Sequence, residues 1–178
     1  PTNLELQDTT DVYKPSIISC KYLPSSNHSS KVKTFEPKNP LEEESLTSSL
    51  GKIVDIDIDG LGLSFVQTGR LVGRIRKIVP DLVLVAKVEN SEGLRNCVDI
   101  VTQSDAIMID RGDLAAEIGF DRLFGSILAI SDQTKAHGKP LIMATENLET
   151  MVDRHLPSKS EVMSIAHSIS IGVDCFML

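Results

Sequence analysis

Lys87 and Glu89 stand two residues apart at the end of an apolar run, Leu82–Val88. On a strand, residues at this spacing project from the same face, so the ammonium and the carboxylate would lie side by side. A carboxylate there can bind a hard cation such as Mg²⁺ through oxygen. The neighbouring ammonium can neutralise negative charge on a phosphate or an enolate. An ordinary ion pair at a strand end explains these two residues about equally well.

The next apolar run, Ala106–Ile109, leads into Asp110-Arg111-Gly112-Asp113. Asp113 offers a second carboxylate for the same cation. Gly112 lets backbone N–H groups approach an anion that a side chain would keep away. The stretch after Gly112 can begin a helix, whose N-terminus favours a bound carboxylate. Arg-Gly-Asp is also an adhesion signal, but adhesion requires an exposed loop of a secreted protein, and the sequence offers neither context.

A third apolar run, Leu141–Ala144, ends in Thr145-Glu146-Asn147. In a β/α barrel the carboxyl ends of the strands face the reaction site. Polar groups that follow consecutive strands are what such a site requires. We therefore expect the Glu89 and Asp113 carboxylates to lie within about 6 Å, a span that one divalent cation bridges with bonds of roughly 2.1 Å.

The elements that must position these residues alternate regularly from about Leu46 onward. Short apolar runs predict strands, and amphipathic stretches at 94–101, 123–128 and 162–169 predict helices between them. This alternation predicts consecutive parallel β/α units, in an open sheet or in a barrel. Ser158 and Glu161 predict a capping box at the start of the last helix. The predicted strands are Leu61–Val66, Leu82–Val88, Ala106–Ile109, Leu141–Ala144 and Cys175–Leu178.

The sequence divides into two regions that differ in composition and in periodicity. Residues 1–45 interleave proline, serine and lysine without a sustained period, and only Ser16–Cys20 has the pattern of a short strand. Such a segment buries little apolar surface by itself, so we predict an extended arm or linker. Residues 46–178 are predicted to form the β/α domain.

Composition narrows the function classes. A formal net charge of −7 argues against nucleic acid and anionic membranes as partners, because both select a basic face. The three cysteines, Cys20, Cys97 and Cys175, are widely spaced, which favours a reducing intracellular compartment. The cytoplasm is the first expectation and an organelle such as a plastid the second. Because the sequence begins at Pro1, either an initiator Met or a longer leader is expected to have been removed.

Several sequence motifs follow each other in register along the chain, in the segments 84–94, 104–114, 138–145, 148–151, 157–161 and 172–178. Together they resemble the pyruvate kinase family. The resemblance extends from about Asp59 to Leu178 and implies a parallel, TIM-barrel-like (β/α) fold of which this sequence holds about the last five strands, an incomplete barrel.

The resemblance implies phosphoryl transfer between phosphoenolpyruvate and ADP, giving pyruvate and ATP. By position, Lys87 is similar to the lysine that stabilises the enolate and the transferring phosphoryl group. Glu89 and Asp113 are similar to the Mg²⁺ or Mn²⁺ ligands. Thr145 would place a hydroxyl near the site of enolate protonation.

Other positions of the resemblance concern substrate binding. Arg111, Gly112 and Asp113 would contribute backbone contacts to the substrate carboxylate. Ser64 and Phe65 match the end of an earlier strand that helps to shape the substrate pocket.

The sequence also departs from the family pattern. Asp110 replaces an alanine and puts a negative charge beside an anion site, where it should oppose a trianionic substrate. Ala115 replaces a glycine, Lys159 an arginine, and Glu146 with Asn147 a Gln-Met pair. The family's first three strands have no recognisable counterpart, nor do its phosphate-binding arginine and asparagine, its K⁺ ligands, its nucleotide lid or its C-terminal domain.

Three functions remain open: a pyruvate kinase-like phosphotransferase, a catalytically inactive subunit with a structural or interaction role, and a metal-dependent lyase acting on a pyruvate enolate. The stretch 113–119 is similar to the helix opening of such lyases, whereas 144–145 and 157–161 fit pyruvate kinase better. An arc of five strands cannot close, and its edges need a cover. We therefore expect an oligomer or a subunit of a larger complex, and little phosphoryl transfer by the 178-residue chain alone.

Overall fold

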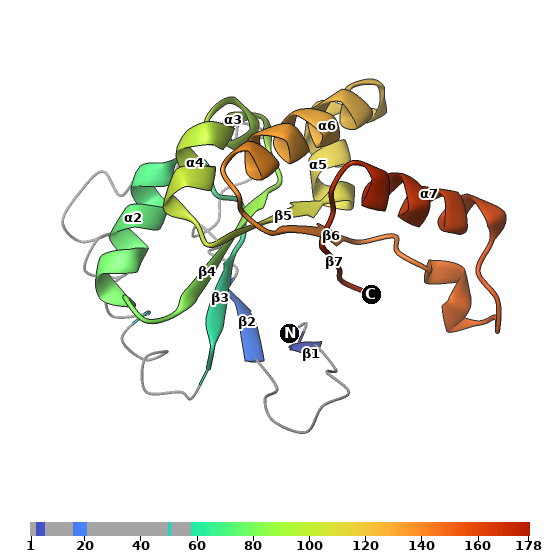
Figure 1. Ribbon diagram of the computed structural model, residues 1–178, viewed down its shortest axis with the longest axis horizontal. Helices are drawn as coiled ribbons and strands as arrows, with labels where there is room; N and C mark the ends of the chain where they lie inside the picture. The colour runs from blue at the N-terminus through green and yellow to red at the C-terminus, as the bar shows by residue number, and fades with distance from the viewer. Residues whose placement is uncertain (1–2, 6–15, 21–49, 51–57) are drawn as a thin grey trace, which may run out of the picture.

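The structure is a computed structural model, and it describes residues 3–5, 16–20, 50 and 58–178. Within these residues, seven strands form one sheet in which the strands follow each other in chain order (Figure 1). β1 and β2 pair antiparallel, while β2 to β7 run parallel. The strands are β1 Asn3–Glu5, β2 Ser16–Cys20, β3 Gly60–Leu63, β4 Val83–Val88, β5 Ala106–Asp110, β6 Leu141–Ala144 and β7 Cys175–Phe176.

This strand order separates the two architectures that the sequence left open. A doubly wound sheet reverses its strand order at a switch point. Here each strand lies beside its successor without a reversal. The predicted consecutive parallel β/α units are therefore confirmed, as part of a barrel-type sheet.

A helix follows each of the strands β3 to β6, and the helix starts are fixed locally. The Thr68, Asn90 and Asp110 side chains accept hydrogen bonds from backbone N–H groups at the starts of α2, α3 and α5. Ser158 and Glu161 form the predicted capping box. The helices are α2 Gly69–Ile78, α3 Ser91–Arg95, α4 Cys97–Gln103, α5 Arg111–Ile118, α6 Phe120–Ala136 and α7 Lys159–Ser170, with a 3₁₀ turn, η1, at Glu149–Val152.

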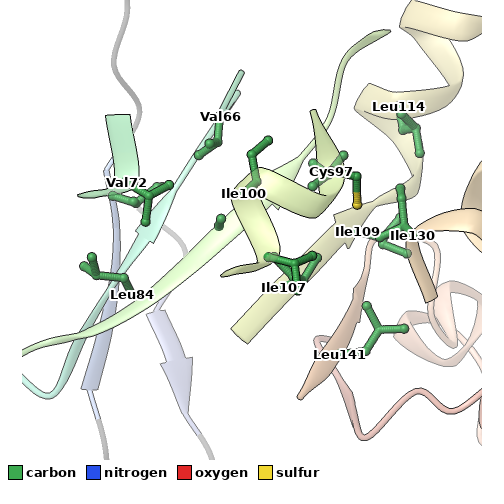
Figure 2. Close-up of a cluster of buried hydrophobic side chains, with 14 of the residues drawn as sticks. Val66, Val72, Leu84, Cys97, Ile100, Ile107, Ile109, Leu114, Ile130 and Leu141 are labelled. Atoms are coloured by element: carbon green, nitrogen blue, oxygen red, sulfur yellow. The ribbon is translucent and has the colours of Figure 1, made fainter. Parts of the chain in front are cut away.

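Strand residues alternate between two buried clusters. Leu84 and Ala86 belong to the larger cluster, in which strands pack against α2, α4, α5 and α6. Figure 2 shows part of this cluster, in which strand side chains such as Leu84 and Ile107 are drawn with side chains from α2, α4, α5 and α6. The opposite face of the sheet carries a smaller cluster, which includes Val85 and Met108. A barrel strand has this arrangement, with one face toward the helices and one toward the lumen.

Some predicted bounds require correction. The strand expected at 61–66 ends at Leu63, because Ser64 and Phe65 form a turn in which Phe65 adopts a left-handed φ of 54°. The last strand spans only Cys175–Phe176 rather than four residues. The helix expected at 94–101 is divided at Asn96 into α3 and α4.

The predicted arm at residues 1–45 falls mostly outside the described residues. Ser16–Cys20 is a strand as predicted, and it pairs parallel with β3. The boundary at residue 45 stays a prediction. Among the described helices, none is long and apolar enough to cross a membrane. Cys97 and Cys175 are free thiols, and burial raises the pKa of Cys97 to about 11.

Candidate functional site

The carboxyl ends of β4 and β5 bring the predicted chemical groups together. Lys87 pairs in register with Met108, so the residues that follow the two strands emerge at the same end of the sheet. Glu89 comes directly after β4, Asp110 ends β5, and Asp113 lies in the first turn of α5. Parallel register thus joins residues that the sequence separates by more than twenty positions.

Lys87 stands between two acidic side chains. Its Nζ lies 2.5 Å from Glu89 Oε1 and 3.3 Å from Asp110 Oδ2. The Lys87 and Asp110 side chains are 11% and 10% exposed, and the Glu89 side chain is 0% exposed. These are buried ion pairs, whose groups are costly to leave without a partner of opposite charge.

Three carboxylates meet beside this lysine. One oxygen each from Glu89, Asp110 and Asp113 lies within 4.8 Å of the others. The expected proximity of Glu89 and Asp113 is confirmed. Sequence reasoning treated Asp110 only as a charge opposing the substrate and missed its place among the carboxylates. The available signal was its position directly after the predicted strand Ala106–Ile109, three residues before Asp113.

The two Glu89 oxygens have different surroundings. Oε2 accepts a hydrogen bond of 2.6 Å from the backbone N–H of Phe65. Oε1 has no hydrogen-bond partner among the described residues, so its close contact with Lys87 is an ion pair without hydrogen-bond geometry. Phe65 reaches the site through its backbone, and its left-handed conformation is of the kind that costs about 1–3 kcal/mol and clusters at functional sites. Ser64, beside it, is half-buried.

Burial and charge shift the pKa values of this pair. Burial raises the pKa of Glu89, and the opposing effects of Lys87 and the Phe65 N–H do not cancel that rise. Burial also acts to lower the pKa of Lys87, but Glu89 and Asp110 outweigh it and the net direction is upward. The lysine is therefore held as an ammonium at neutral pH.

Thr145 closes the site on the side of β6. Its Oγ1 accepts a hydrogen bond of 3.1 Å from the Gly112 N–H and donates one of 2.7 Å to the Ala144 carbonyl. Thr145 is left-handed, with φ 64°. A Cβ at Gly112 would meet Asp110 Oδ1 and Thr145 Oγ1 at 3.7 and 3.8 Å, which is ordinary contact. The protein's own packing therefore does not require glycine here, and the predicted approach of an anion stays a prediction.

The Arg111 side chain forms hydrogen bonds with other residues of the chain. Its guanidinium donates to the Thr145 carbonyl, to Asn147 Oδ1 at 2.8 Å and to Ser164 Oγ at 2.9 Å. Burial lowers the pKa of Arg111, with Glu146 acting in the opposite direction. The side chain thus connects the start of α5 to the segment after β6 and to α7. The predicted backbone contact of Arg111 with a substrate stays a prediction.

Asn147 is a second residue whose role sequence reasoning missed. Its Nδ2 donates to the Met143 and Met177 carbonyls at 3.0 and 2.9 Å, while its Oδ1 accepts from Arg111. The side chain is buried and joins the ends of β6 and β7. The sequence analysis noted Asn147 as a polar residue after a predicted strand and as a departure from the family pattern, but it predicted no contact for the side chain.

These features define a class of protein: a segment of a parallel β/α barrel with lysine and carboxylates at the carboxyl ends of its strands, where such barrels carry their active sites. The family profile described as "Pyruvate kinase, barrel domain" matches residues 38–178. The chain belongs to the pyruvate kinase family.

Curated relatives agree with this assignment. The chain is 37% identical over 125 residues to "Pyruvate kinase, cytosolic isozyme" of Nicotiana tabacum. The matching region covers 68% of this chain and 25% of the relative. It is 38% identical over 125 residues to "Probable pyruvate kinase, cytosolic isozyme" of Arabidopsis thaliana, with the same coverage. It is 35% identical over 129 residues to "Pyruvate kinase" of Dictyostelium discoideum, covering 70% of this chain and 25% of the relative. The chain thus spans about a quarter of the length of these relatives.

Proposed function

We propose that this chain is a pyruvate kinase-like domain whose cluster at the ends of β4 and β5 binds a divalent cation and the enolate form of pyruvate. The observation that carries the proposal is the buried contact of Lys87 with Glu89, together with the proximity of Glu89 and Asp113. Phosphoryl transfer between phosphoenolpyruvate and ADP is the corresponding reaction of the complete barrel.

The residues fit Mg²⁺ or Mn²⁺. Both ions select oxygen ligands, and Glu89 and Asp113 provide carboxylates close enough to share one ion. Glu89 Oε1 is buried and has no hydrogen-bond partner among the described residues, which leaves its acceptor capacity available. A bound cation would supply charge stabilisation for an enolate or phosphoryl oxygen. Potassium stays an expectation from the resemblance.

The roles of the other residues follow from their positions. Lys87 would place its ammonium against negative charge that develops on an enolate or a phosphoryl group. Thr145 would hold its hydroxyl beside the Gly112 N–H, near the carbon that gains a proton. Phe65 orients Glu89 through its N–H group, and Ser64, beside it in the chain, would contribute to a substrate site.

A second candidate is a catalytically inactive subunit with an interaction role. Asp110 favours it, because this carboxylate already contacts Lys87 and adds negative charge where an anionic substrate would bind. In that case the cluster would stabilise the fold without turning over a substrate. Oligomer formation would be expected under either candidate. An intracellular, cytosolic location is proposed from two relatives that are named as cytosolic isozymes.

The test follows exchange of the pyruvate methyl protons in D₂O by ¹H NMR, with the purified 178-residue chain, Mg²⁺ and K⁺. We expect cation-dependent exchange that is lost in Lys87→Met and Glu89→Gln, because these variants remove the ammonium and a ligand. Lys135→Met, which changes an exposed ion pair with Asp174, is the matched control and should exchange like the unaltered chain.

The same preparation is assayed for pyruvate formation from phosphoenolpyruvate and ADP. We expect turnover well below about 1 s⁻¹, the lower end of the range typical of kinases. Turnover at or above that value, abolished by Lys87→Met, would contradict this expectation and establish the complete activity in this chain. Absence of both exchange and turnover would overturn the proposal in favour of the inactive subunit.

A further inference from the structure

Asp110 occupies a place that the pyruvate kinase resemblance does not assign to a ligand. It is the last residue of β5 and is buried, with 7% of its surface exposed. Its Oδ1 accepts a hydrogen bond of 3.4 Å from the Asp113 N–H, and its Oδ2 lies 3.3 Å from Lys87 Nζ. One of its oxygens lies within 4.8 Å of oxygens from Glu89 and Asp113. Asp110 therefore faces the same point as the two expected cation ligands.

The formal charges of this cluster match a divalent ion. Three carboxylates and the Lys87 ammonium leave a formal charge of −2, which one divalent cation neutralises. With alanine in place of Asp110, as in the family pattern, the same groups would carry −1. A divalent cation would then leave a positive site that attracts an anion. The third carboxylate thus replaces a negative ligand that an anionic substrate would otherwise provide.

An independent observation also indicates a cation here. Glu89 Oε1 is fully buried and has no hydrogen-bond partner among the described residues. Buried polar atoms almost always have hydrogen-bond partners, so a buried carboxylate oxygen that has only an ion pair with Lys87 is consistent with a further ligand such as a cation. Lys87 pairs with this oxygen at 2.5 Å, and a carboxylate oxygen has two lone pairs, so it can also bind a cation.

We infer that Asp110 is a third carboxylate ligand of a divalent-cation site formed with Glu89 and Asp113. The inference rests on the proposed cation site and adds that the ion binds tightly without an anionic substrate. Asp110 thereby raises the affinity for the metal and lowers the affinity for phosphoenolpyruvate.

The experiment is Mn²⁺ titration of the full chain near pH 7.5, with free Mn²⁺ measured by electron paramagnetic resonance. Asp110→Asn removes the charge while keeping an oxygen for the Asp113 N–H, and Asp132→Asn makes the same change on an exposed position of α6. We expect Asp110→Asn to lower the affinity for Mn²⁺ by about tenfold or more. Even the loss of a residue that only hydrogen-bonds to a metal ligand can have an effect of this size. Asp132→Asn should leave the dissociation constant within twofold.

Adding phosphoenolpyruvate tests the charge argument. Mn²⁺ affinity should change less than twofold in the unaltered chain and should increase clearly in Asp110→Asn, where an anion can replace the lost carboxylate. Asp110→Ala is the second variant if Asp110→Asn fails to fold, as judged by far-UV circular dichroism, and the same results are expected of it.

The outcomes separate the inference from the proposed function. If Glu89→Gln abolishes Mn²⁺ binding but the Asp110 variants bind like the unaltered chain, Asp110 is no ligand and the two-carboxylate site stands. If phosphoenolpyruvate enhances Mn²⁺ binding equally with and without Asp110, the charge argument fails. If the unaltered chain binds no Mn²⁺, both the inference and the proposed cation site are wrong.

Discussion

At the scale of single residues, the site depends on charges that are placed where water is largely excluded. Lys87 contacts Glu89 and Asp110, and all three side chains are nearly or fully buried. Removing one partner of a buried pair leaves the other charge uncompensated, which costs far more than the pair contributes when intact. Exposed pairs behave differently, because water solvates each partner alone.

Lys87→Met is expected to lower the free energy of unfolding by about 3–5 kcal/mol, because Glu89 and Asp110 lose their shared counter-charge. Urea unfolding of the 178-residue chain, followed by far-UV circular dichroism, measures the change. In Lys135→Met, whose ion pair with Asp174 has side chains 37% and 48% exposed, the loss should stay below about 1 kcal/mol. Equal losses in the two variants would show that burial of the cluster has no energetic consequence.

At the scale of elements, the start of α7 illustrates how one side chain organises a turn and a helix. Glu161 accepts hydrogen bonds from the Thr150 N–H at 2.8 Å and from the Ser158 N–H at 2.7 Å, and also from the Thr150 hydroxyl. These bonds, those from Thr150 first, lower the pKa of Glu161 from 4.5 to about 2. The carboxylate thus joins η1 to the first turn of α7.

A lowered pKa makes the contribution of Glu161 depend on pH. It stabilises the fold fully above the ordinary value of 4.5 and is lost as the pH falls toward 2. The stability difference between the unaltered chain and Glu161→Gln should therefore be constant near neutral pH and shrink between pH 4.5 and 2. Urea unfolding across this range measures it.

Ser158→Ala provides the control for this experiment. It removes the helix cap at a cost of about 1 kcal/mol but leaves the Thr150 bonds that chiefly lower the pKa. Its stability should therefore retain most of the pH dependence that Glu161→Gln removes. A difference between the unaltered chain and Glu161→Gln that stays constant down to pH 2 would disprove the assigned role of the carboxylate.

At the scale of the whole molecule, one buried cluster connects most of the described chain. It runs from Leu50 through β3 to β6 and four helices to Val173. Ile107 of β5 lies near its centre and is 0% exposed. Because the same cluster supports both ends of the sheet segment, we expect these elements to unfold together rather than one β/α unit at a time.

Ile107→Ala is expected to cost about 2–5 kcal/mol, the range for truncating a fully buried aliphatic side chain. Val83→Ala, at a position of β4 that is 44% exposed, should change stability by only about 0.5 kcal/mol. Hydrogen exchange should lose protection in α2 and α6 together in Ile107→Ala. Retained protection in α2 with loss in α6 would mean that the cluster is not one cooperative unit.

The sequence by itself determined the β/α alternation, most strand positions, the capping box at Ser158 and the grouping of Lys87, Glu89 and Asp113. These features follow from local patterns: apolar runs, helical spacing and polar residues at strand ends. The family could also be identified from the sequence, because several motifs occur along the chain in the same order as in the pyruvate kinase family. The function of each residue was less accessible, since residue type does not specify which atoms meet.

Only the tertiary structure decided the contacts made across long separations in sequence. The Phe65 N–H reaches Glu89 over 24 positions, and Arg111 reaches Ser164 over 53. Asp110 joined the carboxylates because parallel register brings the ends of β4 and β5 together, although its sequence context indicated only repulsion of a substrate. The physical reason is that the register of parallel strands and turns such as the left-handed Phe65 depend on how distant strands pack together, which the adjoining residues alone do not specify.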